Sequence, residues 1–358
     1  NKILAAMGCT LQDLANTQPE PLKLTSLFRK LDAAGIKKEW LLNRILPPDI
    51  VYKLDGEKLG EQKILENVAL YISRVFNCSV DNILNPLPLS LASSLTKTAK
   101  FKALKGAEEK YTTAYALYAH YLALLVLQAT EHIQTRSLPS DPKVMRSEVE
   151  DAYGPLNFEN VLHYIWDHGI PIIPLSDPGT FHGACWNVSG RNVIVLKQIT
   201  KYQGRWLHDL LHEIGHVKKH LSKKNSLDGI VEDDEISPFE DEIEEREASD
   251  FASELLFSGR AEELAETCVE VARNSVERLK LAVIQVAANE HVPVDLLANY
   301  MAFRLSKANH INWWGTANNL QITDPPPWSI AKEALLKRIN SEQLNPEDYN
   351  LLMRSLEE

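Results

Sequence analysis

The stretch LHDLLHEIGHVKKH, residues 207–220, constrains the fold more than any other, because it has a histidine at every fourth position. On an α-helix, residues four apart lie one turn apart on the same face, about 40° from each other. Two neighbouring histidines can therefore reach one ion, whereas His208 and His220 lie about 120° apart, so all four cannot share it. Leucine, isoleucine and valine form an apolar stripe beside the histidines, which predicts a half-buried helix.

The middle pair of histidines encloses a glutamate in the order HExxH, as His212, Glu213 and His216. In zinc peptidases with this pattern the two imidazoles bind the metal, and the carboxylate takes a proton from the attacking water. The pattern arises by chance in about one chain in a hundred of this length. The apolar helix and the strand-like run NVIVLKQ before it favour the metal site. We interpret His208 as a surface residue or a support for a ligand, and His220 as a packing or hydrogen-bonding residue.

A zinc site with three protein ligands needs one more donor. Ten carboxylates lie within residues 232–247, and we expect most of them in a solvated loop. The third ligand should lie on a helix with an apolar face, which EEREASDFASELL provides. Glu245 lies on the side of that face, and Glu244 and Glu247 are alternatives. Gly215 has no Cβ and would allow a second helix to approach closely.

The other segments predict a mostly helical α+β fold with one small sheet. Short amphipathic helices are expected before residue 88, and a long helix from about Lys102 to about Gln134. The runs IPIIPL, HGACWNV and NVIVLKQ predict strands, and Ser189-Gly190 predicts a hairpin between the last two. We divide the chain into residues 1–88, a helical domain; 89–100, a linker; 101–260, the HExxH domain; 261–321, a small helical domain; and 322–358, a C-terminal helical extension.

Charge and cysteine content narrow the class of protein. Residues 1–110 hold 16 Lys and Arg against 12 Asp and Glu, whereas the remainder holds 22 against 37. An acidic body does not suit nucleic acid, so only the first part could contact DNA.

The four cysteines form no CxxC pair, the longest apolar run, Ala114–Ala129, is shorter than a membrane span, and the first residues lack a secretory-signal pattern. We therefore expect a cytoplasmic protein with no membrane partner.

Several motifs together resemble the ImmA/IrrE family of metallo-endopeptidases. HEIGHVKKH and EREASDFASELL are similar to the two site motifs of the family, YIWDHGIPIIPL and GRNVIVL to its lead-in, and VAANEHVPVDLLANYMAFRLSKANHINWW to its helical tail. The resemblance covers roughly residues 145–320 and is specific, because the motifs occur in the right order. It implies a zincin-like peptidase fold. It also implies His212, His216 and Glu245 as ligands of zinc or, alternatively, manganese, and Glu213 as the general base.

One position departs from the family pattern. The family usually has Asn or Asp directly after the alanine of the second motif, whereas this chain has Ser249, followed by Asp250. Residues that orient a ligand in this way tune metal affinity about tenfold or more. Ser249 and Asp250 are therefore candidates for supporting the ligands, and Tyr202 and His208 are candidates for stabilising the oxyanion.

The first 88 residues resemble, more loosely, a helix-turn-helix domain of the Cro/repressor type. ENVALYISRVFNCSVDNILNP is similar to the last two helices of such domains. The helix in the recognition position, PPDIVYKL, offers Tyr52 and Lys53 but also Asp49, where contacts to DNA usually require Arg, Lys, Gln or Asn. Two interpretations stay open: DNA binding, or a docking or dimerisation module with the same fold.

The resemblance implies cleavage of a partner transcriptional repressor or antitoxin, often itself of helix-turn-helix type, which relieves repression in a stress, mobile-element or defence response. An extended peptide can pair with a sheet edge. We expect this edge to be the NVIVL strand or the strand formed by Cys185, Trp186, Asn187 and Val188. Trp186 would contact substrate or pair with an aromatic residue across the hairpin. The alternatives are a DNA-binding regulator with a structural or inactive metal site, and a zinc hydrolase of small molecules.

Overall fold

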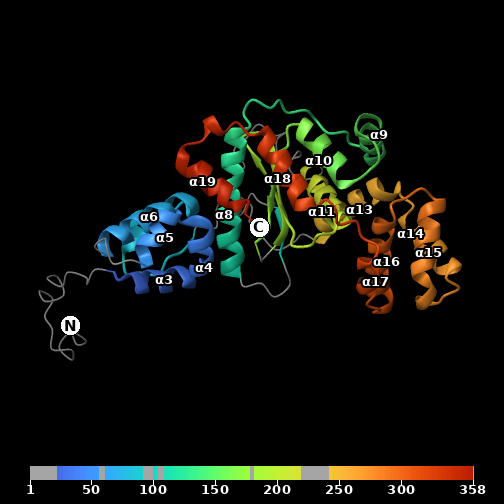
Figure 1. Ribbon diagram of the computed structural model, residues 1–358, viewed down its shortest axis with the longest axis horizontal. Helices are drawn as coiled ribbons and strands as arrows, with labels where there is room; N and C mark the ends of the chain where they lie inside the picture. Colours follow the sequence, from blue (N-terminus) through green and yellow to red (C-terminus); the bar gives the residue numbers. More distant parts are fainter. Residues whose placement is uncertain are drawn as a thin grey trace, which may run out of the picture. The chain divides into compact units, whose positions relative to one another are not determined.

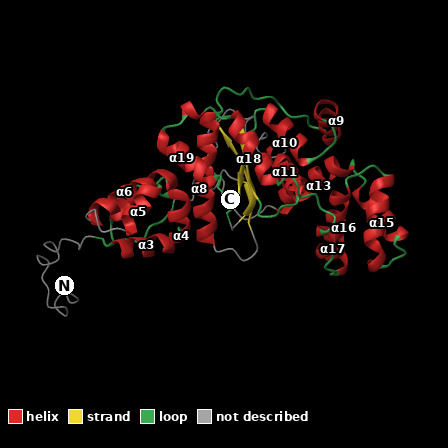
Figure 2. Ribbon diagram, viewed as in Figure 1, coloured by secondary structure: helices red, strands yellow, loops and turns green. Residues whose placement is uncertain are grey.

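The computed structural model describes residues 22–55, 61–91, 100–103, 109–177, 181–218 and 242–357. The chain forms two compact units, Asn1–Ala92 and Ser93–Glu358, and each is described by itself. Most described residues are helical, and the second unit contains one four-stranded sheet (Figure 2). The predicted α+β class is therefore confirmed. None of the described helices is both long enough and apolar enough to cross a membrane.

The first unit is a set of short amphipathic helices, as predicted. They are α3 (Leu24–Ala33), α4 (Lys38–Trp40), the π-helical turn η1 (Leu41–Ile45), α5 (Pro48–Asp55), α6 (Glu61–Phe76) and α7 (Val80–Leu84). Gly35 follows the first helix with φ +93°, a conformation that glycine adopts without strain. The Ser79 side chain accepts a hydrogen bond from the Asn82 amide and so caps α7. Leu27 and Leu31 of α3 are fully buried.

Helix α5 would be the recognition helix of a helix-turn-helix domain. Its Lys53 ammonium lies 3.0 Å from the Asp49 carboxylate one turn earlier, so an acidic neighbour already pairs with this lysine. Tyr52 is 73% exposed. This surface therefore offers an exposed aromatic ring and a paired lysine, and the helix-turn-helix assignment stays a prediction.

The sheet of the second unit has the strand order β1-β3-β4-β2. Its strands are β1 (Lys100–Ala103), β2 (Ile172–Leu175), β3 (Phe181–Val188) and β4 (Arg191–Lys197). β3 and β4 form an antiparallel hairpin through Ser189 and Gly190, whose φ values are 51° and 81°. Two positive φ values are what a two-residue type I′ turn requires. The three predicted strands and their hairpin are confirmed.

The predicted helix from Lys102 to Gln134 is wrong at both ends. Lys102 lies in β1, which pairs antiparallel with β3, and helix α8 comprises only Glu109–Ala129. The backbone pairing of β1 is non-local, so the helical periodicity nearby gave no sign of it. At the other end, the Thr130 hydroxyl donates to the Val126 carbonyl, and α8 stops there.

Helices cover both faces of the sheet (Figure 1). Side chains alternate along β3, so neighbouring residues face opposite sides. Trp186 meets His120 of α8 on one face, with ring centroids 5.7 Å apart. Gly183 faces Glu213 of helix α11 (Gln203–His216) on the other. The sheet is therefore the middle layer, and the HExxH helix packs on the face opposite α8.

The remaining helices surround this core. They are α9 (Pro142–Tyr153), α10 (Phe158–Asp167), α13 (Glu242–Phe257), α14 (Ala261–Val271), α15 (Val276–Asn289), α16 (Val294–Asn309), α17 (Trp314–Asn318), α18 (Pro327–Arg338), η4 (Ser341–Gln343) and α19 (Pro346–Ser355). Helix α18 contacts β2 and α10. The Tyr121 hydroxyl of α8 donates to the Asp348 carboxylate of α19 at 2.7 Å. Residues 261–321 and 322–358 thus lie in the same unit as the sheet.

Candidate metal centre

Helices α11 and α13 pack closely, and Gly215 lies at their contact. A Cβ added to Gly215 would lie 2.8 Å from the Ala248 Cα atom, closer than side chains approach a backbone. Ala248 and Ala252 of α13 are fully buried in this contact region. The expectation that Gly215 allows a second helix to approach is confirmed.

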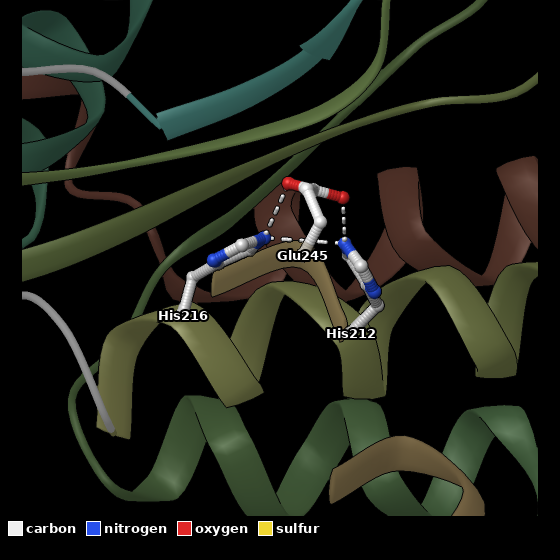
Figure 3. Close-up of side chains that lie close together, drawn as sticks. All are labelled: His212, His216 and Glu245. Atoms are coloured by element: carbon white, nitrogen blue, oxygen red, sulfur yellow. Dashed lines mark hydrogen bonds and ion pairs between the residues drawn. The ribbon is translucent and has the colours of Figure 1, made fainter. Parts of the chain in front are cut away.

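This contact brings three donor side chains together, two from α11 and one from α13 (Figure 3). The Nε2 atoms of His212 and His216 lie 3.1 Å apart. The two oxygens of Glu245 lie 3.2 Å from the His212 Nε2 atom and 3.1 Å from the His216 Nε2 atom. All three side chains therefore point at one small volume.

Burial and hydrogen bonding shift the pKa values of two of these donors, His212 and Glu245. The His212 and His216 residues are 4% and 2% exposed. Burial lowers the pKa of His212. For Glu245, burial acts to raise the pKa, but hydrogen bonds from His212 and His216 outweigh it and hold the pKa well below the usual range. A neutral imidazole and an ionised carboxylate are the forms that bind metals.

The donor set fits a tetrahedral divalent ion. Zinc binds imidazole nitrogen and carboxylate oxygen at about 2.0 Å, and a tetrahedron with such bonds has edges of about 3.3 Å. The observed separations of 3.1–3.2 Å are close to that value. Two imidazoles and one carboxylate leave a fourth position open, as catalytic zinc sites do. Glu245, rather than Glu244 or Glu247, is the acidic residue that completes the cluster.

Glu213, which follows His212 on α11, packs against the sheet. Its residue is only 2% exposed. A Cβ added to Gly183 would overlap the Glu213 carboxylate, so this carboxylate lies directly against the backbone of β3. Gly183 was missed in the sequence, although a glycine inside a strand is a signal for close approach of another group.

Ser249, the residue after the alanine of the second motif, lies beside one of the clustered histidines. Its Oγ atom lies 3.4 Å from Nδ1 of His212, the ring nitrogen that does not face Glu245. Contacts of this kind fix the orientation of a metal-binding imidazole. Asp250 is exposed and is not brought to the cluster.

The two residues proposed to stabilise the oxyanion, His208 and Tyr202, lie at different distances from the three clustered donors. His208 stacks on His212, with ring centroids 6.4 Å apart, and its side chain is 47% exposed. Tyr202 precedes α11, ten residues before His212, or about 15 Å along the axis at 1.5 Å per residue. Its ring contacts Arg205 instead. The structure therefore brings His208 near the triad but not Tyr202. His220 lies outside the described residues.

Of the two strands predicted as an edge for substrate, the prediction is wrong for the NVIVL strand and for Cys185, which are paired inside the sheet, whereas residues 186–188 lie beyond the described pairing of β1. β3 lies between β1 and β4, and the NVIVL residues belong to β4, which lies between β3 and β2. Cys185 and Trp186 are buried, and Trp186 faces α8. The residue opposite Trp186 is Val193, so it forms no aromatic pair across the hairpin either.

Asn187 and Val188, the last two residues of β3, lie next to the hairpin turn. The Asn187 amide donates to the Asn192 side chain at 2.8 Å, and Val188 is paired with Arg191 beside the turn. Both residues are thus engaged with β4. The order of strands in a sheet is a non-local property, which explains why the edge was misplaced.

We expect Gly215→Ala to disturb the centre without touching a ligand. The added methyl group must push α13 away, and overpacking of this kind costs about 1–3 kcal/mol of unfolding free energy. Glu245 moves with α13, so metal affinity should fall as well. Thermal unfolding and zinc titration measure both effects, with Gly315→Ala as control because a Cβ there meets nothing within 4 Å. Unchanged stability and zinc affinity would contradict the helix contact.

Residues 166–287 match the family model of M78 peptidases, described as the IrrE N-terminal-like domain. The matched stretch includes the HExxH helix and Glu245. No curated protein and no solved structure matches the chain. This part of the chain is therefore similar to the M78 peptidase domain, which supports the resemblance to the ImmA/IrrE family there. The first unit lies outside the match.

Proposed function

We propose that this chain is a zinc-dependent endopeptidase that cleaves a partner transcriptional repressor or antitoxin. The observation that carries the proposal is the convergence of His212, His216 and Glu245 within 3.1–3.2 Å, together with a buried Glu213 that follows His212 on α11. The M78 peptidase match supports a metallopeptidase, and the resemblance to the ImmA/IrrE family supports the substrate class. Manganese is the alternative metal.

The side chains of the centre have different roles: three bind the metal, one transfers a proton and one orients a ligand. His212, His216 and Glu245 hold the ion, which when bound polarises a carbonyl and makes water acidic enough to attack near neutral pH. Glu213 accepts the proton of the attacking water and passes it to the leaving amine. Ser249 keeps the His212 ring in its binding orientation. The contact between Glu213 and the backbone of β3 supports a proton transfer next to this strand.

The experiment that tests this function uses purified protein loaded with zinc or manganese. It is incubated with the repressors and antitoxins encoded beside it, and products are identified by mass spectrometry. We expect one cleavage site, loss of cleavage with 1,10-phenanthroline, and recovery when zinc is returned. DNA binding without cleavage would favour the regulator, and hydrolysis of small amides alone would favour the small-molecule hydrolase.

Metal loading also gives a readout independent of substrate. A ligand that binds only the folded state at 100 times its Kd stabilises that state by about 2.7 kcal/mol. Zinc should therefore raise the Tm of the protein, and chelation should reverse the shift. A Tm that does not respond to zinc or manganese would remove the basis of the proposal.

A further inference from the structure

The edge of β3 beside the candidate metal centre is held by another segment of the chain. β1 pairs antiparallel with β3 in the register Lys100↔Cys185, Phe101↔Ala184 and Ala103↔Phe181. These partners lie on both sides of Gly183, the residue against which Glu213 packs. Within the described residues, β4 pairs with one edge of β3, and β1 pairs with the other edge at Phe181, Ala184 and Cys185. At Gly183 itself β3 is paired with β4, and its pairing with β1 lies on either side of this glycine, where the β1 register shifts.

Strand spacing decides which position a substrate must take. Neighbouring strands lie about 4.8 Å apart. A peptide added outside β1 would run about 9.6 Å from β3, whereas one in the place of β1 would run about 4.8 Å from it. A general base must lie within hydrogen-bond distance, about 3 Å, of the group whose proton it takes, or reach that group through one water molecule. Because the Glu213 carboxylate lies against β3, only the nearer position brings a scissile carbonyl within its reach.

We propose that β1 occupies the place of the substrate strand and that substrate must displace it to be cleaved. This inference rests on the proposed peptidase function and adds its regulation. The kind of partner is an extended peptide that can pair antiparallel with Phe181–Cys185. In this proposal the substrate pairs with β3, one of the two strands named from the sequence, and a segment of the same chain covers its residues 181–185.

β1 pairs with β3 in a way that would allow another peptide to replace it. β1 has four residues, and its register shifts between Phe101 and Ala103. A strand this short contributes few ladder hydrogen bonds, and an irregularity interrupts them. An incoming peptide with an unbroken ladder can therefore compete with it.

A disulfide lock tests the inference in the full chain. Lys100 lies opposite the native Cys185, and opposite residues of an antiparallel pair have Cα atoms about 4.5–5.5 Å apart. A disulfide spans Cα distances of about 4.4–6.8 Å. We expect Lys100→Cys to form this disulfide on mild oxidation. Lys102→Cys, which has no partner in the register, and the double variant Lys100→Cys/Cys185→Ala serve as controls.

The zinc-loaded variant is then assayed for cleavage of the partner repressor before and after reduction with TCEP. We expect the oxidised form to cleave at least tenfold more slowly than the reduced form, with no such difference in either control. Phe101→Pro, which removes a backbone N–H from β1, should accelerate cleavage. Equal rates in the locked and reduced forms, or failure of the disulfide to form in folded protein, would overturn the inference.

A second measurement separates this inference from the proposed function. If the reduced protein cleaves nothing, the peptidase proposal fails. Hydrogen exchange of residues 100–103 in the Glu213→Gln variant then reports on β1 without catalysis. Added repressor should increase exchange there when it displaces β1. Unchanged exchange with bound repressor would show that β1 stays in place, which contradicts the inference whatever the activity.

Discussion

Replacing Glu213 with glutamine is expected to slow peptide cleavage by about 10²–10⁴-fold, the usual contribution of a general acid–base residue. The glutamine amide is nearly the same size but does not accept a proton near neutral pH. The effect should appear in kcat, since Glu213 is not one of the three clustered donors. Cleavage of the partner repressor under saturating conditions measures it.

Measuring the metal content of the Glu213→Gln variant distinguishes loss of the general base from damage to the metal site. Zinc binding by the Glu213→Gln variant should equal that of the unaltered protein, and its Tm shift with zinc should be preserved. Full activity in the variant would remove Glu213 from the mechanism. Loss of zinc together with activity would show that the substitution disturbed the helix instead.

Replacing Glu245 with glutamine should abolish cleavage by removing the metal. An amide oxygen carries no charge, and the site loses the group whose carboxylate contacts both histidines. Since residues that merely orient ligands contribute about 10–100-fold to metal affinity, loss of a ligand should cost more than that. Isothermal titration with zinc and elemental analysis of the purified variant measure the change.

Glu244→Gln is the matched control, because Glu244 precedes Glu245 on the same helix and was an alternative ligand from the sequence. This variant should retain zinc and activity. If Glu244→Gln lost zinc while Glu245→Gln retained it, the assignment of the third ligand would be wrong. The two variants thus test which glutamate is the third ligand, a question that residue spacing alone left open.

Local patterns predicted much of the site, because they concern residues close in sequence. The spacing of His212 and His216 places them on one helix face, and the structure shows their Nε2 atoms together. Gly215 predicted a close helix contact, which its distance to Ala248 confirms. The hairpin followed from Ser189-Gly190, whose conformation is determined within the turn.

Properties that depend on distant segments were not predictable in the same way. The sheet edge was misplaced because nothing in β3 itself reveals that β1 will pair with it. The sequence predicts Lys100 as the end of a linker and Lys102 as the start of a helix, since helical periodicity begins only a few residues after β1. The contact between Gly183 and Glu213 joins a strand to a helix 30 residues away in sequence and was also missed.

The close approach of α11 and α13 is a requirement for the ion-binding geometry in its own right. Glu245 reaches His212 and His216 because Gly215 lets Ala248 come near, and neither of these two residues is itself a donor. A bulkier residue at either position would therefore move the donors apart without altering any of them, so the small size of these two residues matters to the centre as much as the chemistry of its donors.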